Sequence, residues 1–122
     1  MSGKTTPPTL RGSTYRVDLP GTALQTLIAP ASNVAGVVIY AYWCIYNSGP
    51  SRLMAKSAAP TAWSDAAART IGAFLNQASV GRVMQDGSCA LPIILLPGEG
   101  LYFQGNGVGT AESFVDVNAE IL

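Results

Sequence analysis

The chain has 122 residues, of which seven are Lys or Arg, seven are Asp or Glu and none is His. This length fits one domain with one hydrophobic core. Because the charges cancel and no basic cluster appears, the sequence indicates neither a nucleic-acid partner nor a membrane-surface partner, and the longest apolar stretch, residues 37–46, is too short to span a bilayer.

Charge is the unusual feature of the composition. Charged residues make up only 11% of the chain, against about 25% of an ordinary soluble domain. A small monomer exposes a large surface and normally covers much of it with charge. A surface poor in charge favours association with copies of itself or with a partner, although a neutral surface rich in Ser, Thr, Asn and Gly is the alternative. We therefore expect a homo-oligomer.

The first 13 residues are polar and include the pair Pro7 and Pro8. Such a composition predicts a flexible or extended arm rather than a folded element. We therefore expect an N-terminal arm at 1–13 and a single β-sandwich domain at 14–122.

Two short strands are predicted after the arm. The stretch "STYRVDL" alternates apolar and polar residues, which is typical of a half-buried strand, and Pro20-Gly21 ends it. The stretch "TALQTLIAP" predicts the second strand, and Pro30 begins the loop that follows it.

The segment "GVVIYAYWCIY" is rich in β-branched and aromatic residues, which favours a strand over a helix. Both of its faces are apolar, so it predicts a central strand or one buried at an interface. After a turn at 47–50, "SRLMAKSA" predicts a strand that pairs with it as a hairpin. Strict alternation gives the two faces as Val37, Ile39, Ala41, Trp43 and Ile45 on one side and Val38, Tyr40, Tyr42, Cys44 and Tyr46 on the other.

Residues 59–79 allow two interpretations. Ser64 could cap a short helix that has Asp65 in its first turn. Thr70 and Gly72 weaken that helix, and a loop followed by a strand is the alternative. The next stretch, "VGRVMQD", predicts a strand.

The stretch "EGLYFQG" differs at one position from ENLYFQG, the site that tobacco etch virus protease cuts. It lies between the apolar run "LPIILL" and the alternating run "SFVDVNAEIL", each set off by turn residues. The three runs predict strand, turn, strand, turn, strand. We therefore expect "GLYF" to be a native strand, and we expect the folded chain to resist that protease after Gln104.

The pattern as a whole predicts an all-β fold. We expect seven to eight short strands, with turn signals roughly every ten residues and at most one short helix. This spacing favours an antiparallel β-sandwich or jelly roll, and the shortage of helix excludes a βαβ architecture.

No residue pattern predicts a catalytic, metal or cofactor site. The lack of His removes the commonest general base, the usual partner of a Ser or Cys nucleophile and the commonest metal ligand. The glycine-rich run Gly105–Gly109 lacks the lysine and the helix of a phosphate loop. Cys44 and Cys89 match no metal spacing; we expect two buried thiols, with a disulfide as the alternative. We therefore expect a protein that is not an enzyme and binds no cofactor.

Aromatic side chains are the best candidates for a contact surface. Large aromatics dominate burial both in cores and between subunits. Packing in the chain's own core is one alternative, and stacking on sugar rings, in which Trp43 would also take part, is another. The residues that we predict at a subunit interface are Tyr40, Tyr42, Tyr46 and Trp63.

Three stretches, "QTLIAPASNVAGVVI", "SAAPTAWSD" and "LPIILLPGEGLYF", together resemble small β-rich virion proteins of tailed bacteriophages, in particular capsid decoration, or cement, proteins. The resemblance covers roughly residues 24–122. It implies a non-enzymatic structural protein of the virion, assembled in the host cytoplasm, that binds the major capsid protein or another virion protein. It also implies a homo-oligomer, with a trimer favoured, that stabilises the capsid.

Members of that group often carry an extended terminal arm, so the resemblance implies that the arm and one end of the sandwich contact the capsid. A receptor- or glycan-binding module of a tail fibre, or another tail component, is the alternative function. The arm residues that become candidate capsid contacts are Lys4, Pro7, Pro8, Leu10 and Arg11.

Overall fold

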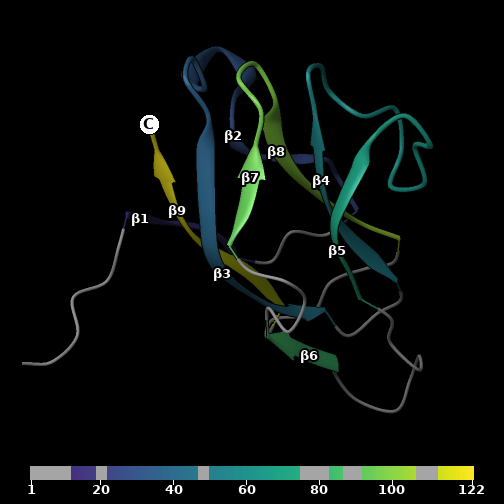
Figure 1. Cartoon of the computed structure of the whole chain (residues 1–122). Helices are drawn as coiled ribbons and strands as arrows, with labels where there is room; N and C mark the ends of the chain where they lie inside the picture. The colour runs from purple at the N-terminus through teal and green to yellow at the C-terminus, as the bar shows by residue number, and fades with distance from the viewer. Residues whose placement is uncertain (1–11, 19–21, 47–49, 75–82, 87–91, 107–112) are drawn as a thin grey trace, which may run out of the picture.

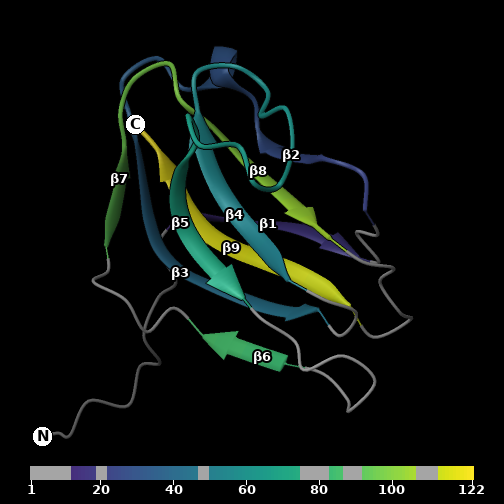
Figure 2. The same ribbon diagram turned by 90° about the vertical axis from the view of Figure 1, so that its right-hand side faces the viewer.

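Two antiparallel β-sheets pack face to face around one hydrophobic core (Figures 1 and 2). The computed structural model describes residues 12–18, 22–46, 50–74, 83–86, 92–106 and 113–122. Within these ranges there are nine strands and one 3-10 helix, η1, so the all-β prediction is confirmed. The elements are β1 (Ser13–Asp18), β2 (Gln25–Ile28), η1 (Pro30–Ser32), β3 (Val37–Tyr46), β4 (Ser51–Lys56), β5 (Arg69–Phe74), β6 (Val83–Asp86), β7 (Ile93–Leu95), β8 (Gly100–Gly105) and β9 (Phe114–Ile121).

The strands pair in a nested order that defines a jelly roll. β1 pairs with β9, β2 with β8, β3 with both β7 and β6, and β4 with β5. β3 also pairs with β9, and β4 with β8. The first sheet therefore runs β1-β9-β3-β6 with β7 on β3, and the second runs β2-β8-β4-β5. Because β6 and β7 lie along the same edge of β3, they act as two pieces of one strand, which reduces nine strands to the eight positions of a jelly roll.

The predicted hairpin of β3 and β4 is wrong. β3 lies in the first sheet and β4 in the second, so the chain crosses between the two layers after Tyr46 (Figure 1). The physical reason is that both edges of each strand are already taken: β3 bonds to β9 on one side and to β6 and β7 on the other, while β4 bonds to β5 and β8.

β3 contains a β-bulge that exchanges its two faces. Ile39 lies opposite Ala119 and Ala41 lies opposite Asn118, so Tyr40 is the extra residue. A bulge of this kind breaks the strict alternation of side chains. The predicted face that joined Tyr40 to Tyr42 is therefore wrong: before the bulge the odd-numbered residues are buried, and after it the even-numbered ones are.

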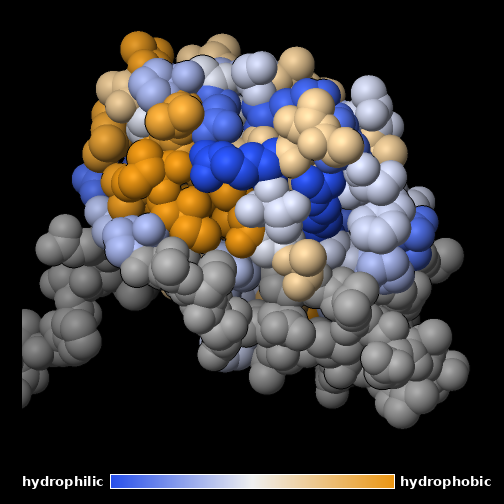
Figure 3. All heavy atoms as spheres, turned by 45° about the vertical axis from the view of Figure 1, so that its right-hand side comes forward, coloured by the Kyte–Doolittle hydropathy of each residue, from blue (hydrophilic) through white to orange (hydrophobic). Residues whose placement is uncertain are grey.

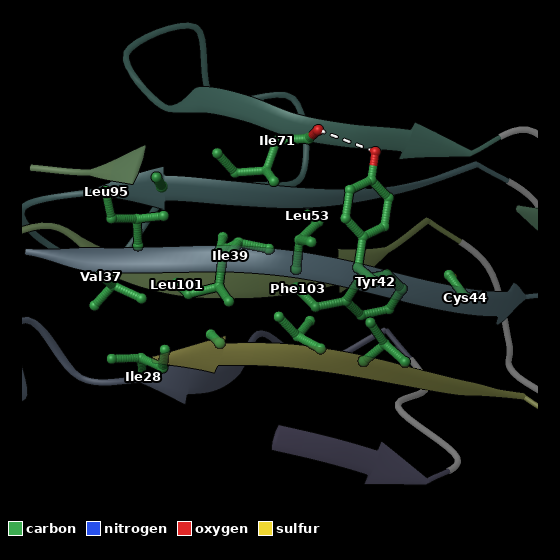
Figure 4. Packing of buried hydrophobic residues seen from close by; sticks show 14 of the residues in the cluster. Ile28, Val37, Ile39, Tyr42, Cys44, Leu53, Ile71, Leu95, Leu101 and Phe103 are labelled. Atoms are coloured by element: carbon green, nitrogen blue, oxygen red, sulfur yellow. Dashed lines mark hydrogen bonds between the residues drawn. The ribbon is translucent and has the colours of Figure 1, made fainter. Parts of the chain in front are cut away.

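The core lies between the sheets and is made of side chains from both (Figure 4). The Tyr42 hydroxyl of β3 donates a hydrogen bond to the Ile71 carbonyl of β5, at 3.3 Å, and so links the two sheets. Tyr46 meets the Phe103 ring edge-on, with 6.0 Å between ring centroids. Burial of this apolar surface contributes about 25 cal/mol per Å² to the stability of the fold.

The ambiguous segment 59–79 contains a loop followed by the strand β5, which is the second of the two predicted alternatives. Asp65 starts no helix. Its carboxylate accepts a hydrogen bond from the Lys56 ammonium at 2.7 Å and from the backbone N–H groups of Thr61 and Ala67. Arg52 donates to the carbonyl oxygens of Trp63, Asp65 and Ala68. These bonds hold the loop before β5 against the second sheet.

β1 begins at Ser13, the first residue of the predicted strand "STYRVDL". Because Ser13 pairs with Ala119, it belongs to the sandwich and not to the predicted arm at 1–13. The stretch that resembles a protease site forms β8, which is bonded to β2 on one side and to β4 on the other. This confirms that "GLYF" is a strand of the fold.

Candidate functional site

The predicted aromatic interface does not exist as one surface. Tyr42 and Tyr46 lie inside the sandwich, with 5% and 1% of their surface exposed, so they have no side-chain surface to offer a second subunit. Tyr40 lies on the outside, where its hydroxyl donates a hydrogen bond to Glu120 Oε1 at 2.7 Å. Trp63 is half-buried in the loop that Arg52 holds. The prediction of interface contacts is therefore wrong for Tyr42 and Tyr46, and it stays a prediction for Tyr40 and Trp63.

The remaining sequence candidates are only partly placed. The arm residues Lys4, Pro7, Pro8, Leu10 and Arg11 lie outside the described residues, and so does Cys89. Cys44 is a free thiol. Burial raises its pKa to about 12, so at neutral pH the reactive thiolate is scarce and the residue behaves as a small apolar side chain.

A group of exposed apolar side chains surrounds the start of β3. We call this surface the apolar end; it comprises Val34, Ile94, Leu96, Ile121 and Leu122, which are between 37% and 80% exposed. These residues come from the loop before β3, from β7 and the turn after it, and from the end of β9. Figure 3 shows apolar side chains gathered on the side of the molecule that carries β7.

Backbone pairing holds the parts of the apolar end together. Val37 lies between Leu95 of β7 and Ile121 of β9. The Leu122 N–H donates to the Gly36 carbonyl at 2.9 Å. Since these contacts belong to the sheet or extend it, the exposed side chains sit on a rigid support.

Asn33 is the residue that fixes the two loops of the apolar end. It is buried, with 1% exposed. Its side-chain amide donates to the carbonyls of Leu96 and Glu99 at 2.8 and 2.9 Å, and its Oδ1 accepts from the Gly36 N–H at 2.7 Å. A fully bonded buried amide of this kind rigidifies its surroundings. It ties the loop before β3 to the turn between β7 and β8.

An ion pair supports the same turn from the second sheet. Arg69 of β5 contacts Glu99 Oε1 at 2.6 Å and also donates to the Ile94 carbonyl at 3.0 Å. Glu99 Oε1 accepts a further bond from the Leu96 N–H at 2.8 Å. Although burial opposes its ionisation, the bonds from Arg69 and Leu96 leave the pKa of Glu99 below its usual value.

A second candidate surface lies on the outer face of the first sheet. A shallow, open depression of about 150 Å³ is lined there by residues of β1, β3 and β9. Trp43 forms one wall, and 43% of its surface is exposed. The other residues that line it are Thr14, Ala41, Tyr42, Asp116 and Asn118.

Charged and aromatic groups border this depression. Arg16 contacts Asp116 Oδ2 at 3.5 Å and Asp18 Oδ1 at 2.9 Å. Its guanidinium also lies over the Phe114 ring, 4.1 Å from the centroid, where a cation is attracted to the aromatic face. The row Arg16–Asp116–Trp43 runs across three paired strands.

The sequence did not predict that the residues of the apolar end, or those of the depression beside Trp43, lie together. Val34 did give a signal, because it is an apolar residue in the loop predicted before residue 37. Leu96 gave none, because it ends the apolar run "LPIILL", which predicts a strand. Among the described residues, no three His, Cys, Asp or Glu side chains group as metal ligands would. No helix in the described ranges has the length and hydrophobicity of a membrane span.

Comparison of the chain with protein-family models, with curated proteins and with solved structures gave no match.

Proposed function

We propose that this chain is a non-enzymatic structural protein of a tailed-phage virion, which binds the capsid as a homo-oligomeric decoration protein. Its resemblance to such proteins over residues 24–122 supports the proposal, and so does its low content of charged residues. Jelly rolls recur in viral capsid and lectin domains. Because one fold hosts many functions, the proposal depends on a surface rather than on the fold.

The observation that carries the proposal is the apolar end. Five large apolar side chains are exposed there. Val34 and Leu96 lie on loops that Asn33 and the Arg69–Glu99 pair hold in place, and the other three lie in β7 or at the end of β9. A group of exposed apolar side chains on a rigid support is typical of a protein–protein contact. Little ordering is needed when such a surface binds, so more of the burial energy remains as affinity.

The place where the described chain begins agrees with this docking surface. The described chain starts at Gly12, which has φ +67° and lies against the Ala119 carbonyl. Ala119 is two residues before Ile121 of the apolar end. The arm therefore joins the sandwich close to that end, so both can contact one capsid surface.

Co-sedimentation with capsids tests the proposal. We expect wild-type chain to pellet with capsids and to raise their melting temperature. Leu96→Asp, which places an unpaired carboxylate in the contact, should weaken binding at least tenfold. Ala58→Asp is the matched control, since Ala58 is exposed in the loop before β5 and the variant carries the same added charge. Equal binding by the two variants would overturn the assignment of the apolar end.

Two further measurements test the capsid contact of the arm and the homo-oligomer separately. Deletion of residues 2–11 should abolish capsid binding while the melting temperature of the free chain stays unchanged, and binding by the deleted chain would rule out the arm as a contact. Sedimentation equilibrium of the purified chain should give a multiple of its 12.7 kDa mass, with a trimer expected. A mass of one chain at every concentration would contradict the homo-oligomer.

The depression beside Trp43 favours a second candidate function, a receptor- or glycan-binding module of a tail fibre. An exposed tryptophan next to a carboxylate and an amide is the kind of surface that such a module needs. A glycan array separates the candidates, because a decoration protein needs no glycan to bind a capsid.

A further inference from the structure

The depression on the outer face of the first sheet has the form of a small ligand site that is separate from the apolar end. It is centred on paired positions of three strands: Thr14, Asn118 and Ala41 lie in one row, and Asp116 and Trp43 lie in the next. We infer that this depression binds one neutral pyranose ring, with the ring face on Trp43 and the hydroxyl edge on Asp116 and Asn118. The inference does not depend on capsid binding.

The bulge in β3 creates the space. Because Tyr40 is the extra residue, Ala41 and Trp43 point to the outer face, whereas strict alternation from Val37 would have put them in the core. Tyr40 itself is directed to Glu120 by its 2.7 Å hydrogen bond. The three small residues Ala41, Asn118 and Thr14 leave a hollow beside the indole.

Trp43 supplies the apolar half of the site. The face of an indole carries partial negative charge. The C–H groups on one face of a pyranose carry partial positive charge and are apolar enough to be buried, so they pack against the indole. An all-equatorial sugar such as a β-glucoside presents these C–H groups without an interrupting hydroxyl, and it is therefore the configuration that fits best.

Asp116 and Asn118 supply the polar half. Arg16 contacts Asp116 through Oδ2 only, and within the part of the chain that the structure describes Oδ1 has no hydrogen-bond partner. The Asn118 side chain makes one long bond, 3.4 Å, to the Ser13 carbonyl, which leaves its Oδ1 and a second N–H for a ligand. A carboxylate and an amide side by side can accept from and donate to two neighbouring hydroxyls.

The size and charge of the hollow limit the size and the charge of the ligand that it can bind. Its volume, about 150 Å³, is below the roughly 300–1,000 Å³ of sites for drug-sized ligands, so it takes one ring and binds it weakly, with a Kd in the millimolar range. A tryptophan beside a carboxylate would also attract a quaternary ammonium ion. The positive charge of Arg16, 3.5 Å from Asp116 Oδ2, opposes the binding of a cation beside that carboxylate.

Titration of the full-length chain with methyl β-D-glucopyranoside, followed by ¹H–¹⁵N NMR, tests the inference. We expect saturable shifts of the Trp43 indole N–H and the Asn118 side-chain amide, and none with glycerol as an acyclic polyol. Trp43→Ala should abolish the response. Trp63→Phe, which changes the other tryptophan, should leave it intact.

A second variant keeps the test decisive if Trp43→Ala fails to fold. Ala41→Phe fills the hollow while it keeps the indole, and it should abolish the saturable shifts. The inference is overturned if wild-type chain shows no saturable shift with any neutral pyranose, if Ala41→Phe responds as wild type does, or if choline binds more tightly than the glucoside.

Discussion

Gly105 and Tyr46 are matched across the core: the tyrosine ring fills the place that a side chain at position 105 would need. A Cβ built on Gly105 overlaps the ring and the hydroxyl of Tyr46. Tyr46 is 1% exposed and packs on Phe103, so it has no free space to move into.

This relationship predicts that Gly105→Ala destabilises the fold. Overpacking of a tight core costs about 1–3 kcal/mol, and urea unfolding measures the loss. The same change in a Tyr46→Ala background should cost clearly less, because the overlapping ring is gone. An equal loss in both backgrounds would show that the ring is not the cause.

The buried amide of Asn33 predicts a second stability effect. Asn33→Ala leaves the Glu99 carbonyl and the Gly36 N–H without the partner that Asn33 provides, while the Leu96 carbonyl still accepts from the Glu99 N–H. Each buried group left unsatisfied costs roughly 1–3 kcal/mol, so we expect a total loss of at least about 2 kcal/mol in the free energy of unfolding. Asn106→Ala is the control: Asn106 is exposed, and a change within about 0.5 kcal/mol is expected there. Similar losses for the two variants would contradict the role given to Asn33.

The hydrogen bonds of Asp65 predict a pH dependence. The bond from Lys56, followed by those from the backbone of Thr61 and Ala67, lowers the pKa of Asp65 well below its usual range. A carboxylate whose pKa is lowered by folding contributes stability that is complete above its unfolded pKa, about 3.9. That contribution is lost as the pH falls below this value and through the folded-state pKa.

The variant Asp65→Asn separates this contribution from that of other carboxylates. It should be less stable than wild type at neutral pH, and the difference should narrow as the pH falls from about 4 towards about 2. Unfolding curves of both proteins across this range measure it. A difference that stays constant with pH would exclude Asp65 as the source.

The position of β8 predicts resistance to proteolysis. Gln104 and Gly105 pair with β4, and the residues just before them in β8 also pair with β2. A protease needs an extended and accessible backbone, which this bond does not offer in the folded chain. Native chain should survive tobacco etch virus protease far longer than a peptide of residues 96–108, and cutting should require global unfolding. Cutting of the native chain as fast as the peptide would contradict the strand assignment.

Some elements could be predicted because their signal is local. The alternation of Val115, Val117 and Ala119 with polar residues predicts β9, and burial follows that pattern. The turn residues on both sides of "GLYFQG" predict β8. In both cases one short window contains the whole signal.

Other features depend on pairing between distant segments and have no local signal. The bulge at Tyr40 arises from the register of β3 against β9, and nothing in "VVIYAYWCIY" marks it. For the same reason the sequence could not predict which tyrosines of β3 face the core and which face the outside of the sheet. The apolar end is assembled by hydrogen bonds that join Asn33 to Leu96 and Gly36 to Leu122, so it could not be predicted before the topology.

The most direct test of the proposed function is the copy number of this chain in purified virions that contain it, measured by quantitative mass spectrometry. A decoration protein is predicted at a copy number comparable with that of the major capsid protein. A handful of copies per particle, as for a tail tip or fibre, would contradict the proposal.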